Sequence, residues 1–307
     1  MSNRLVKSWI PLLAAVCTLL TLFPFLHVLT QTRNSRAILS EAPPPYDHKV
    51  AYGSDPLQFG ELRLPPANRF KQPYPVAVVL HGGCWMAEYG LGYMGHLSAD
   101  LAAAGVATWN VEYRRVGDAG GAWPGTFADA GLAVDYVRTL AKSYPLDVRR
   151  VLTVGHSAGS HLALWVAARS RLPQDSPLHS RDPLPLLGVV ALAGITDLRR
   201  TGTACDVEVG KLMQGSVAER GSVYDLASPL ALLPLKVPQV IVQGDSDRII
   251  PSAMASSYVE AARQKGDAVK LVMIEKAGHF ELVDPQTLAW TRIKEEILLM
   301  VRPGAGK

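Results

Sequence analysis

The stretch VLTVGHSAGSHLALWVA, residues 151–167, joins a short apolar run, a turn of small residues and a helix-forming segment. Its first four residues have the pattern of a buried strand, and its second half is rich in good helix formers. Between them, Gly155 and Gly159 flank Ser157. Glycines at these positions permit a strained turn and close packing of the helix on the strand, so we expect an exposed nucleophilic serine. The alternative is an ordinary serine at the start of a helix.

The rest of the chain alternates between strand-like and helix-like segments. Strand-like segments lie at 57–64, 75–83, 106–115, 186–195, 238–245 and 269–279, and helix-like segments at 96–105, 126–144, 251–266 and 285–301. Most strand-like segments are continuous apolar runs, which is typical of strands buried on both faces, and 57–64 resembles an edge strand. This alternation predicts an α/β fold with a mainly parallel, twisted sheet and helices on both faces.

Composition and charge exclude some classes of function. The chain has 307 residues, is 48% hydrophobic and carries a formal charge of +4. Four basic residues and no acidic one lie in positions 1–40, so the remainder carries 27 basic and 27 acidic residues and no nucleic-acid partner is expected. Of the three cysteines, Cys17 lies in an apolar segment, whereas Cys84 and Cys205 could pair. No cysteine and histidine cluster has the spacing of a metal site.

The N-terminal residues predict a membrane or export segment. No charged residue occurs in the 25 positions from Ser8 to Thr32, which suits a spanning helix better than a cleavable signal. We therefore interpret residues 1–32 as a membrane anchor, with the remaining chain outside the cytoplasm, periplasmic or extracellular; ordinary secretion is the alternative. Residues 33–47 contain three consecutive prolines and are expected to form a stiff linker. The main domain is then 48–303.

A nucleophilic serine needs a base, and the base needs a carboxylate that orients it. In parallel sheets such groups collect at the carboxyl ends of strands. His279 follows the last predicted strand, and Asp245 and Asp247 both follow PQVIVQG. We prefer Asp247 as the acid, because Asp245 directly follows Gly244 and could brace the turn instead. Asp245 stays open as an alternative.

The oxyanion of an acyl-transfer reaction needs a pair of backbone N–H groups. One is expected from Ala158, at the start of the helix after the nucleophile. The other is expected from the sequence VVLHGGCW after an earlier strand, where Gly83 and Cys84 are both candidate donors. His81 is interpreted as structural, holding this loop through its ring nitrogens.

Several other residues have two interpretations. His156 and His161 are too close in sequence to the serine to act as its base, so a structural role is expected for both. Trp85 either contacts the substrate or belongs to the core. Residues 196–236 lack a clean periodicity and are expected to form a small insertion over the site, where they help to shape the pocket.

Four ordered motifs, HGGCW, GHSAGSHLA, GDSDRIIP and AGHF, together resemble the α/β-hydrolase superfamily. Within it, they are similar to the hormone-sensitive-lipase-like carboxylesterases and, more closely, to the kynurenine-formamidase-like esterases. The resemblance covers about residues 45–300. One departure is Cys84, which replaces the third glycine of the carboxylesterase motif His-Gly-Gly-Gly. A cysteine would be strained there if the position required a positive φ.

The resemblance implies a serine hydrolase that cleaves small or medium-sized carboxylic esters through an acyl-enzyme intermediate, without a metal or organic cofactor. Arylformamidase or peptidase-like amide hydrolysis would use the same residues, so the partner is a small-molecule ester or amide. A third interpretation is a catalytically silent binding protein of the same fold. Substrate preference and oligomeric state do not follow from these motifs.

Overall fold

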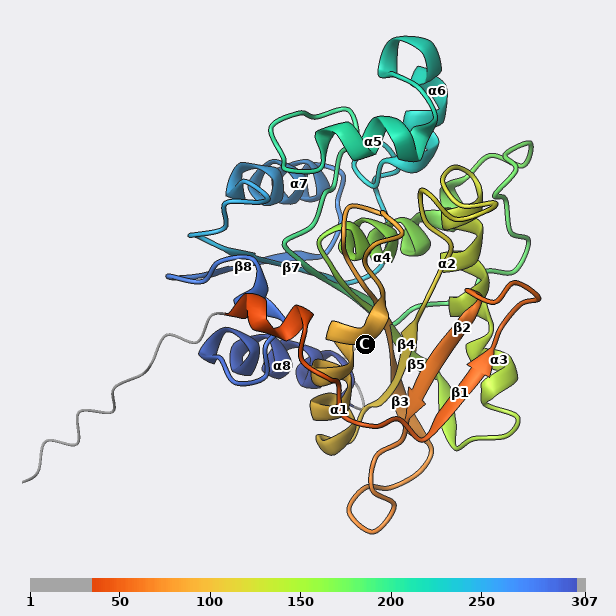
Figure 1. Cartoon of the computed structure of the whole chain (residues 1–307), viewed down its shortest axis with the longest axis vertical. Helices are drawn as coiled ribbons and strands as arrows, with labels where there is room; N and C mark the ends of the chain where they lie inside the picture. Colours follow the sequence, from red (N-terminus) through yellow and green to blue (C-terminus); the bar gives the residue numbers. More distant parts are fainter. Residues whose placement is uncertain (1–34, 303–307) are drawn as a thin grey trace, which may run out of the picture. The chain divides into compact units, whose positions relative to one another are not determined.

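An eight-stranded sheet runs through residues 35–302, the part of the chain that the computed structural model describes (Figure 1). The strands are β1 (His48–Ala51), β2 (Phe59–Arg63), β3 (Tyr74–Leu80), β4 (Ala107–Val111), β5 (Leu146–His156), β6 (Gly188–Leu192), β7 (Gln239–Gly244) and β8 (Val269–Ile274). Their order is β1-β2-β4-β3-β5-β6-β7-β8, and every pairing from β4 to β8 is parallel. The predicted α/β class with a mainly parallel sheet is confirmed.

Helices cover both faces of this sheet (Figure 1). They are α1 (Gly95–Ala103), α2 (Gly125–Asp135), α3 (Val137–Leu140), α4 (Ala158–Ala168), α5 (Asp206–Met213), α6 (Val217–Ala227), α7 (Ser252–Gln264) and α8 (Leu288–Met300). Helices α1 and α8 pack on one face, and α2, α3, α4 and α7 on the other. The single helix expected over 126–144 is divided into α2 and α3. The segment 196–236, between β6 and β7, carries α5 and α6.

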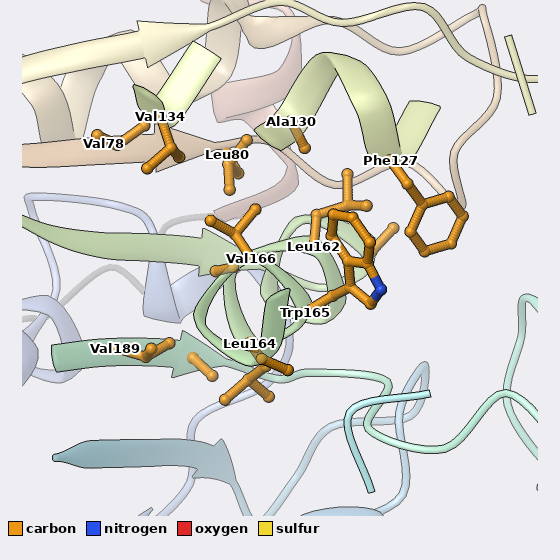
Figure 2. Packing of buried hydrophobic residues seen from close by; sticks show 14 of the residues in the cluster. Val78, Leu80, Phe127, Ala130, Val134, Leu162, Leu164, Trp165, Val166 and Val189 are labelled. Atoms are coloured by element: carbon orange, nitrogen blue, oxygen red, sulfur yellow. The ribbon is translucent and has the colours of Figure 1, made fainter. Parts of the chain in front are cut away.

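The central strand β3 shows why the predicted apolar runs are continuous. All seven of its residues are buried, and alternate side chains point to opposite faces. Val78 and Leu80 pack with α2 and α4, whereas Ala77 and Val79 pack with α1. Figure 2 shows Leu80 in one apolar layer with side chains of α2 and α4. A strand between two helix layers has no solvent face, so its sequence does not alternate.

The two glycines around Ser157 allow α4 to lie directly on the sheet. A Cβ at Gly159 would lie 2.1 Å from the carbonyl oxygen of Leu80 and 2.4 Å from that of His81. A Cβ at Gly155 would lie 2.2 Å from the carbonyl oxygen of Gly159. Because these neighbours are backbone atoms that cannot move aside, both positions require glycine, as the motif predicted.

The edge strand differs from the expectation. β2 pairs with β1 on one side and with β4 on the other, so the edge is the four-residue β1. The segment 57–64 has an almost fully buried strand because β1 covers it. The sequence of β1 is too short and too polar to show a strand pattern by itself.

Part of the expected linker packs against the domain. Residues Ser35–Leu39 form a 3₁₀ turn, η1, in which Ile38 is fully buried. Arg63 donates hydrogen bonds to the carbonyl oxygens of Pro44 and Pro45, at 2.8 and 3.1 Å. The described part of 33–47, interpreted from the sequence as a stiff linker, therefore contacts the domain, and the compact unit of the structure includes it from Ser35 onward.

The expected membrane anchor, residues 1–32, lies outside the described residues. Within 35–302, none of the helices combines the length and the apolar character that a membrane span requires.

Candidate active site

Ser157 lies on a strained turn between β5 and α4. Its φ of 55° and ψ of −122° are unusual for a residue with a side chain. Its backbone N–H donates to the carbonyl oxygen of Leu192 at 2.8 Å, which fixes the turn to the neighbouring strand β6. Tertiary contacts therefore hold the serine in this conformation, as expected for a nucleophile at the top of a parallel sheet.

The structure pairs Asp247 with His279. The Nδ1 of His279 donates to Oδ2 of Asp247 at 2.8 Å. The other carboxylate oxygen accepts the backbone N–H groups of Ile249 and Ile250, at 2.7 and 3.0 Å. Burial acts to raise the pKa of Asp247, but these hydrogen bonds hold it below its usual value. The carboxylate is therefore ionised and its orientation is fixed.

Asp245 has the bracing role that we considered for it. Its Oδ1 accepts hydrogen bonds from the backbone N–H of Lys276 at 2.7 Å and from the hydroxyl of Ser246 at 2.9 Å. These bonds tie the end of β7 to the turn after β8. The carboxylate that contacts His279 is thus that of Asp247.

A cavity of about 260 Å³ collects the predicted residues. Ser157, His279, Gly83 and Cys84 all line it. Aromatic and aliphatic side chains form most of the remaining wall, among them Phe280. The cavity therefore combines mostly apolar walls with the hydroxyl-bearing Ser157, the imidazole of His279 and the glycine-containing loop at one place.

Of the three residues expected to hold an oxyanion through their N–H groups, Gly83 and Cys84 line the cavity, whereas the fully buried Ala158 is not among its lining residues. Among residues 35–302, no hydrogen bond uses the N–H of Gly83, Cys84 or Ala158. Gly83 has φ = 106°, and a Cβ there would lie 2.2 Å from the Cβ of Tyr89, so the loop requires glycine at this position. Unpaired amides at a cavity wall can bind a developing negative charge.

Cys84 occupies the strained position that the motif comparison indicated. Its φ is 49°, in the left-handed region that costs a side-chain-bearing residue roughly 1–2 kcal/mol. A disulfide joins it to Cys205, with a Cα–Cα distance of 5.4 Å. The adjacent Ala204 also lines the cavity, so the segment before α5 reaches the site. The possible cysteine pair is therefore formed, and it anchors the loop that carries Gly83.

Trp85, which was expected either to contact the substrate or to belong to the core, is not among the residues that line the cavity. Its side chain is fully buried in the main core cluster. The indole ring meets His161 edge-on at 5.2 Å. With φ = 57°, its backbone turns the side chain inward beneath the loop. The alternative interpretation of Trp85 as a core residue describes the structure.

Several wall residues were not predicted. Arg36 and Leu39 come from η1, Tyr93 from the 3₁₀ turn η2 (Leu91–Met94), and Phe280 from η4 (Phe280–Leu282). The position of Phe280 next to the proposed base was a usable signal. The others carried no signal, because long-range packing alone brings them to the cavity.

The remaining buried histidines have structural partners. His81 contacts the carbonyl oxygen of Gly82 through Nδ1 and Oε1 of Glu112 through Nε2, both at 2.8 Å, so it holds the loop as predicted. The Nε2 of His161 donates to the carbonyl oxygen of Ala227 at 2.9 Å. Burial lowers the pKa of His161 to about 4.

His161 should make the folded state sensitive to acid. Its folded pKa of about 4 lies below the unfolded value of about 6.5, so below pH 6.5 the unfolded state binds a proton that the folded state refuses. The free energy of unfolding should fall between pH 6.5 and 4, by about 2–3 kcal/mol from this group. We expect His161→Leu to lose less stability than the wild type between pH 7.5 and 4.5, as measured by urea unfolding.

The matched control for this prediction is His179→Leu, since His179 is exposed. For each variant, the measured quantity is the difference in the free energy of unfolding between the two pH values. The hydrogen bond that His161→Leu loses is missing at both pH values, so it does not contribute to this difference. If His161→Leu and the wild type lose the same stability, His161 is not the acid-sensitive group.

Comparisons with known proteins find relatives that match most of this chain. The chain is 24% identical over 272 residues to a probable isoprenylcysteine alpha-carbonyl methylesterase, ICMEL1, of Oryza sativa subsp. japonica, covering 82% of this chain and 61% of the relative. It is 26% identical over 259 residues to the acylamino-acid-releasing enzyme of Rattus norvegicus, covering 77% and 32%. The chain thus spans less than two thirds of both relatives.

The fold is also found among solved structures. A truncated carbohydrate esterase from gut microbiota superposes with a TM-score of 0.72 at 21% identity, covering 85% of this chain and 99% of the other. The profile of one family, BD-FAE, matches residues 62–261, which include Gly83, Cys84, Ser157 and Asp247. The chain therefore belongs to the BD-FAE family, a family of hormone-sensitive-lipase-like α/β-hydrolases.

Proposed function

We propose that this protein hydrolyses carboxylic esters with small or medium-sized acyl groups, using Ser157 as the nucleophile. One observation carries the proposal: Ser157, on its strained turn, lines the same cavity as His279, whose Nδ1 is held by Asp247 at 2.8 Å. The free N–H groups beside this cavity and the names of the relatives, several of which are esterases, support it.

Each step uses a group of the chain itself. The Oγ of Ser157 attacks the ester carbonyl while Nε2 of His279 takes its proton, and Asp247 stabilises the resulting imidazolium. The N–H groups of Gly83, Cys84 and Ala158 hold the tetrahedral oxyanion. His279 then returns the proton to the alkoxy oxygen, so that the alcohol leaves and the acyl group stays on Ser157. Water, activated by His279, hydrolyses this acyl-enzyme and restores the serine.

Amide hydrolysis is the second candidate function, favoured by the similarity to an acylamino-acid-releasing enzyme. The same residues would protonate a leaving amine instead of an alcohol. The difference lies in the leaving group that the cavity accepts, so a substrate panel separates the two functions.

The test is hydrolysis of p-nitrophenyl acetate, butyrate and octanoate and of a formyl anilide by the full chain. A cavity of about 260 Å³ should accept acetate and butyrate better than octanoate. A fluorophosphonate should label Ser157, as identified by peptide mass spectrometry. Efficient cleavage of the formyl anilide with poor ester turnover would favour the amide hydrolase. Absence of both turnover and labelling would overturn the esterase and the amide hydrolase. The interpretation as a catalytically silent binding protein would then remain.

The disulfide should support activity as well as stability. Cys84 and Cys205 are 121 residues apart, and a cross-link over so long a loop stabilises a protein by about 2–4 kcal/mol. Reduction with dithiothreitol should therefore lower the urea midpoint. Because it also releases Cys84, whose N–H is proposed to bind the oxyanion, we expect kcat for p-nitrophenyl butyrate to fall about tenfold. Reoxidation should restore both.

Cys17→Ser is the background for this experiment, since it leaves these two cysteines as the sole thiols. An unchanged kcat in the fully reduced protein would show that the oxyanion loop does not need the disulfide.

We further propose that the domain works outside the cytoplasm, where disulfides persist. The Cys84–Cys205 bond supports this location. Trapping of thiols with a maleimide, in protein taken directly from its native cells, should find these two cysteines unreactive until a reductant is added. Immediate labelling of both would contradict the proposed location.

A further inference from the structure

A series of three hydrogen bonds runs through Tyr93 and His156, two residues of the cavity wall. The N–H of Gly82 donates to Oη of Tyr93 at 2.6 Å. The same oxygen lies 2.9 Å from Nδ1 of His156, and Nε2 of His156 lies 3.1 Å from the carbonyl oxygen of His279. This series therefore connects the oxyanion loop to the loop of the catalytic base, two segments almost 200 residues apart.

The hydrogen bonds define one arrangement of protons. The carbonyl oxygen of His279 only accepts, so Nε2 of His156 carries a proton. In a neutral ring Nδ1 is then an acceptor, and the hydroxyl of Tyr93 donates to it. The lone pairs of that hydroxyl are left for the N–H of Gly82. Each buried donor and acceptor in this series of hydrogen bonds thus has a partner, and only one assignment of the protons satisfies all of them.

The surroundings of His156 keep this arrangement. Burial, together with the nearby ring of His279, lowers the pKa of His156 well below its usual value, so the ring is neutral at neutral pH. Burial likewise raises the pKa of Tyr93, so the phenol keeps its proton. The centroids of the His156 and His279 rings lie 4.5 Å apart, and Nδ1 of His279 is hydrogen-bonded to Asp247.

His156 lines the cavity and neighbours Ser157, yet both of its nitrogens are used. It has no lone pair for a substrate proton. His156 in this arrangement therefore does not act as the base. The buried hydrogen bonds of Tyr93 and His156 need another explanation.

We propose that Tyr93 and His156 form a positioning pair. The pair holds the proposed oxyanion loop, residues 82–84, at a fixed position relative to His279. Gly82 directly precedes Gly83, so fixing its N–H also fixes the adjacent amides that face the cavity. This proposal rests on the proposed function, because the register matters only if both loops act on one carbonyl group.

Tyr93→Phe removes one oxygen and leaves the ring in place. The N–H of Gly82 and Nδ1 of His156 lose their partner, and the loop is freed to shift. Since oxyanion donors act mainly on the transition state, we expect kcat to fall about 10- to 100-fold with little change in KM. The Ki of a trifluoromethyl ketone, which forms a tetrahedral adduct with the serine, should rise by a similar factor.

Tyr258→Phe is the matched control. Tyr258, on α7, is also buried, and its hydroxyl donates to Oε1 of Gln239, on β7, at 2.7 Å. It should lose similar stability but keep kcat and the inhibitor Ki. His156→Gln retains a donor for the carbonyl oxygen of His279, so it should keep more activity than His156→Leu. Equal kcat in Tyr93→Phe and the wild type, or a change in KM alone, would overturn the proposal.

A measurement on the wild type covers the case in which these variants do not fold. Nitrogen-15 spectra of the histidine rings should show two neutral rings, those of His156 and His161, that are protonated at Nε2 and do not titrate between pH 5.5 and 8.5. The signal that His161→Leu leaves in place belongs to His156. Titration of the His156 ring within this range would overturn the proton arrangement. Turnover that persists in Ser157→Ala would instead refute the proposed function, so the two failures are distinguishable.

Discussion

Ser157→Ala is expected to lower kcat for p-nitrophenyl butyrate by about five to six orders of magnitude, to a residual rate that the oxyanion site alone supports. Without Oγ no acyl-enzyme can form, so the fluorophosphonate label should also disappear. The fold should remain, because alanine keeps the Cβ and the backbone N–H that bonds to Leu192 is unchanged. Stopped-flow kinetics and urea unfolding of the same preparation measure both effects.

Ser160→Ala provides the control within the same helix. Ser160 is fully buried, and its hydroxyl reaches the carbonyl oxygens of Gly155 and Leu192, at 2.6 and 2.7 Å. Its loss should cost about 1 kcal/mol of stability and leave kcat within a few-fold. If Ser157→Ala kept more than a tenth of the wild-type kcat, the nucleophile would have to be sought elsewhere.

Asp247→Asn should lower kcat by about 10⁴-fold. The carboxylate holds the proton of His279 on Nδ1 and stabilises the imidazolium, whereas an amide at the same place can present its NH₂ group and favour the wrong tautomer. Asparagine can still accept the N–H groups of Ile249 and Ile250, so the loop should stay folded. The rate is measured with p-nitrophenyl butyrate at pH 7.5.

The matched control is Asp245→Asn, two residues away in the same loop. Its carboxylate braces the turn at Lys276 and does not touch His279. We expect kcat to change less than threefold and stability to fall by about 1 kcal/mol. A large loss of kcat from Asp245→Asn with a small loss from Asp247→Asn would reverse the assignment of the acid.

The sequence by itself determined the α/β alternation and the turn that carries Ser157. Apolar periodicity acts within a few residues, so it remains visible in the sequence. The motif also shows the glycines of the turn, although the contacts that require Gly159 come from the distant strand β3 and its following loop. The preference for Asp247 over Asp245 also came from local chain position, and their hydrogen bonds in the structure agree with it.

The tertiary structure alone decided what surrounds these residues. The packing of η1 places Arg36 and Leu39 at the cavity, and the disulfide joins the oxyanion loop to Cys205. Trp85 adjoins that loop in sequence, yet positive φ angles turn its ring into the core. Contacts between distant segments, and the direction of a side chain in a strained loop, depend on how the whole chain packs. No local pattern of residues encodes them.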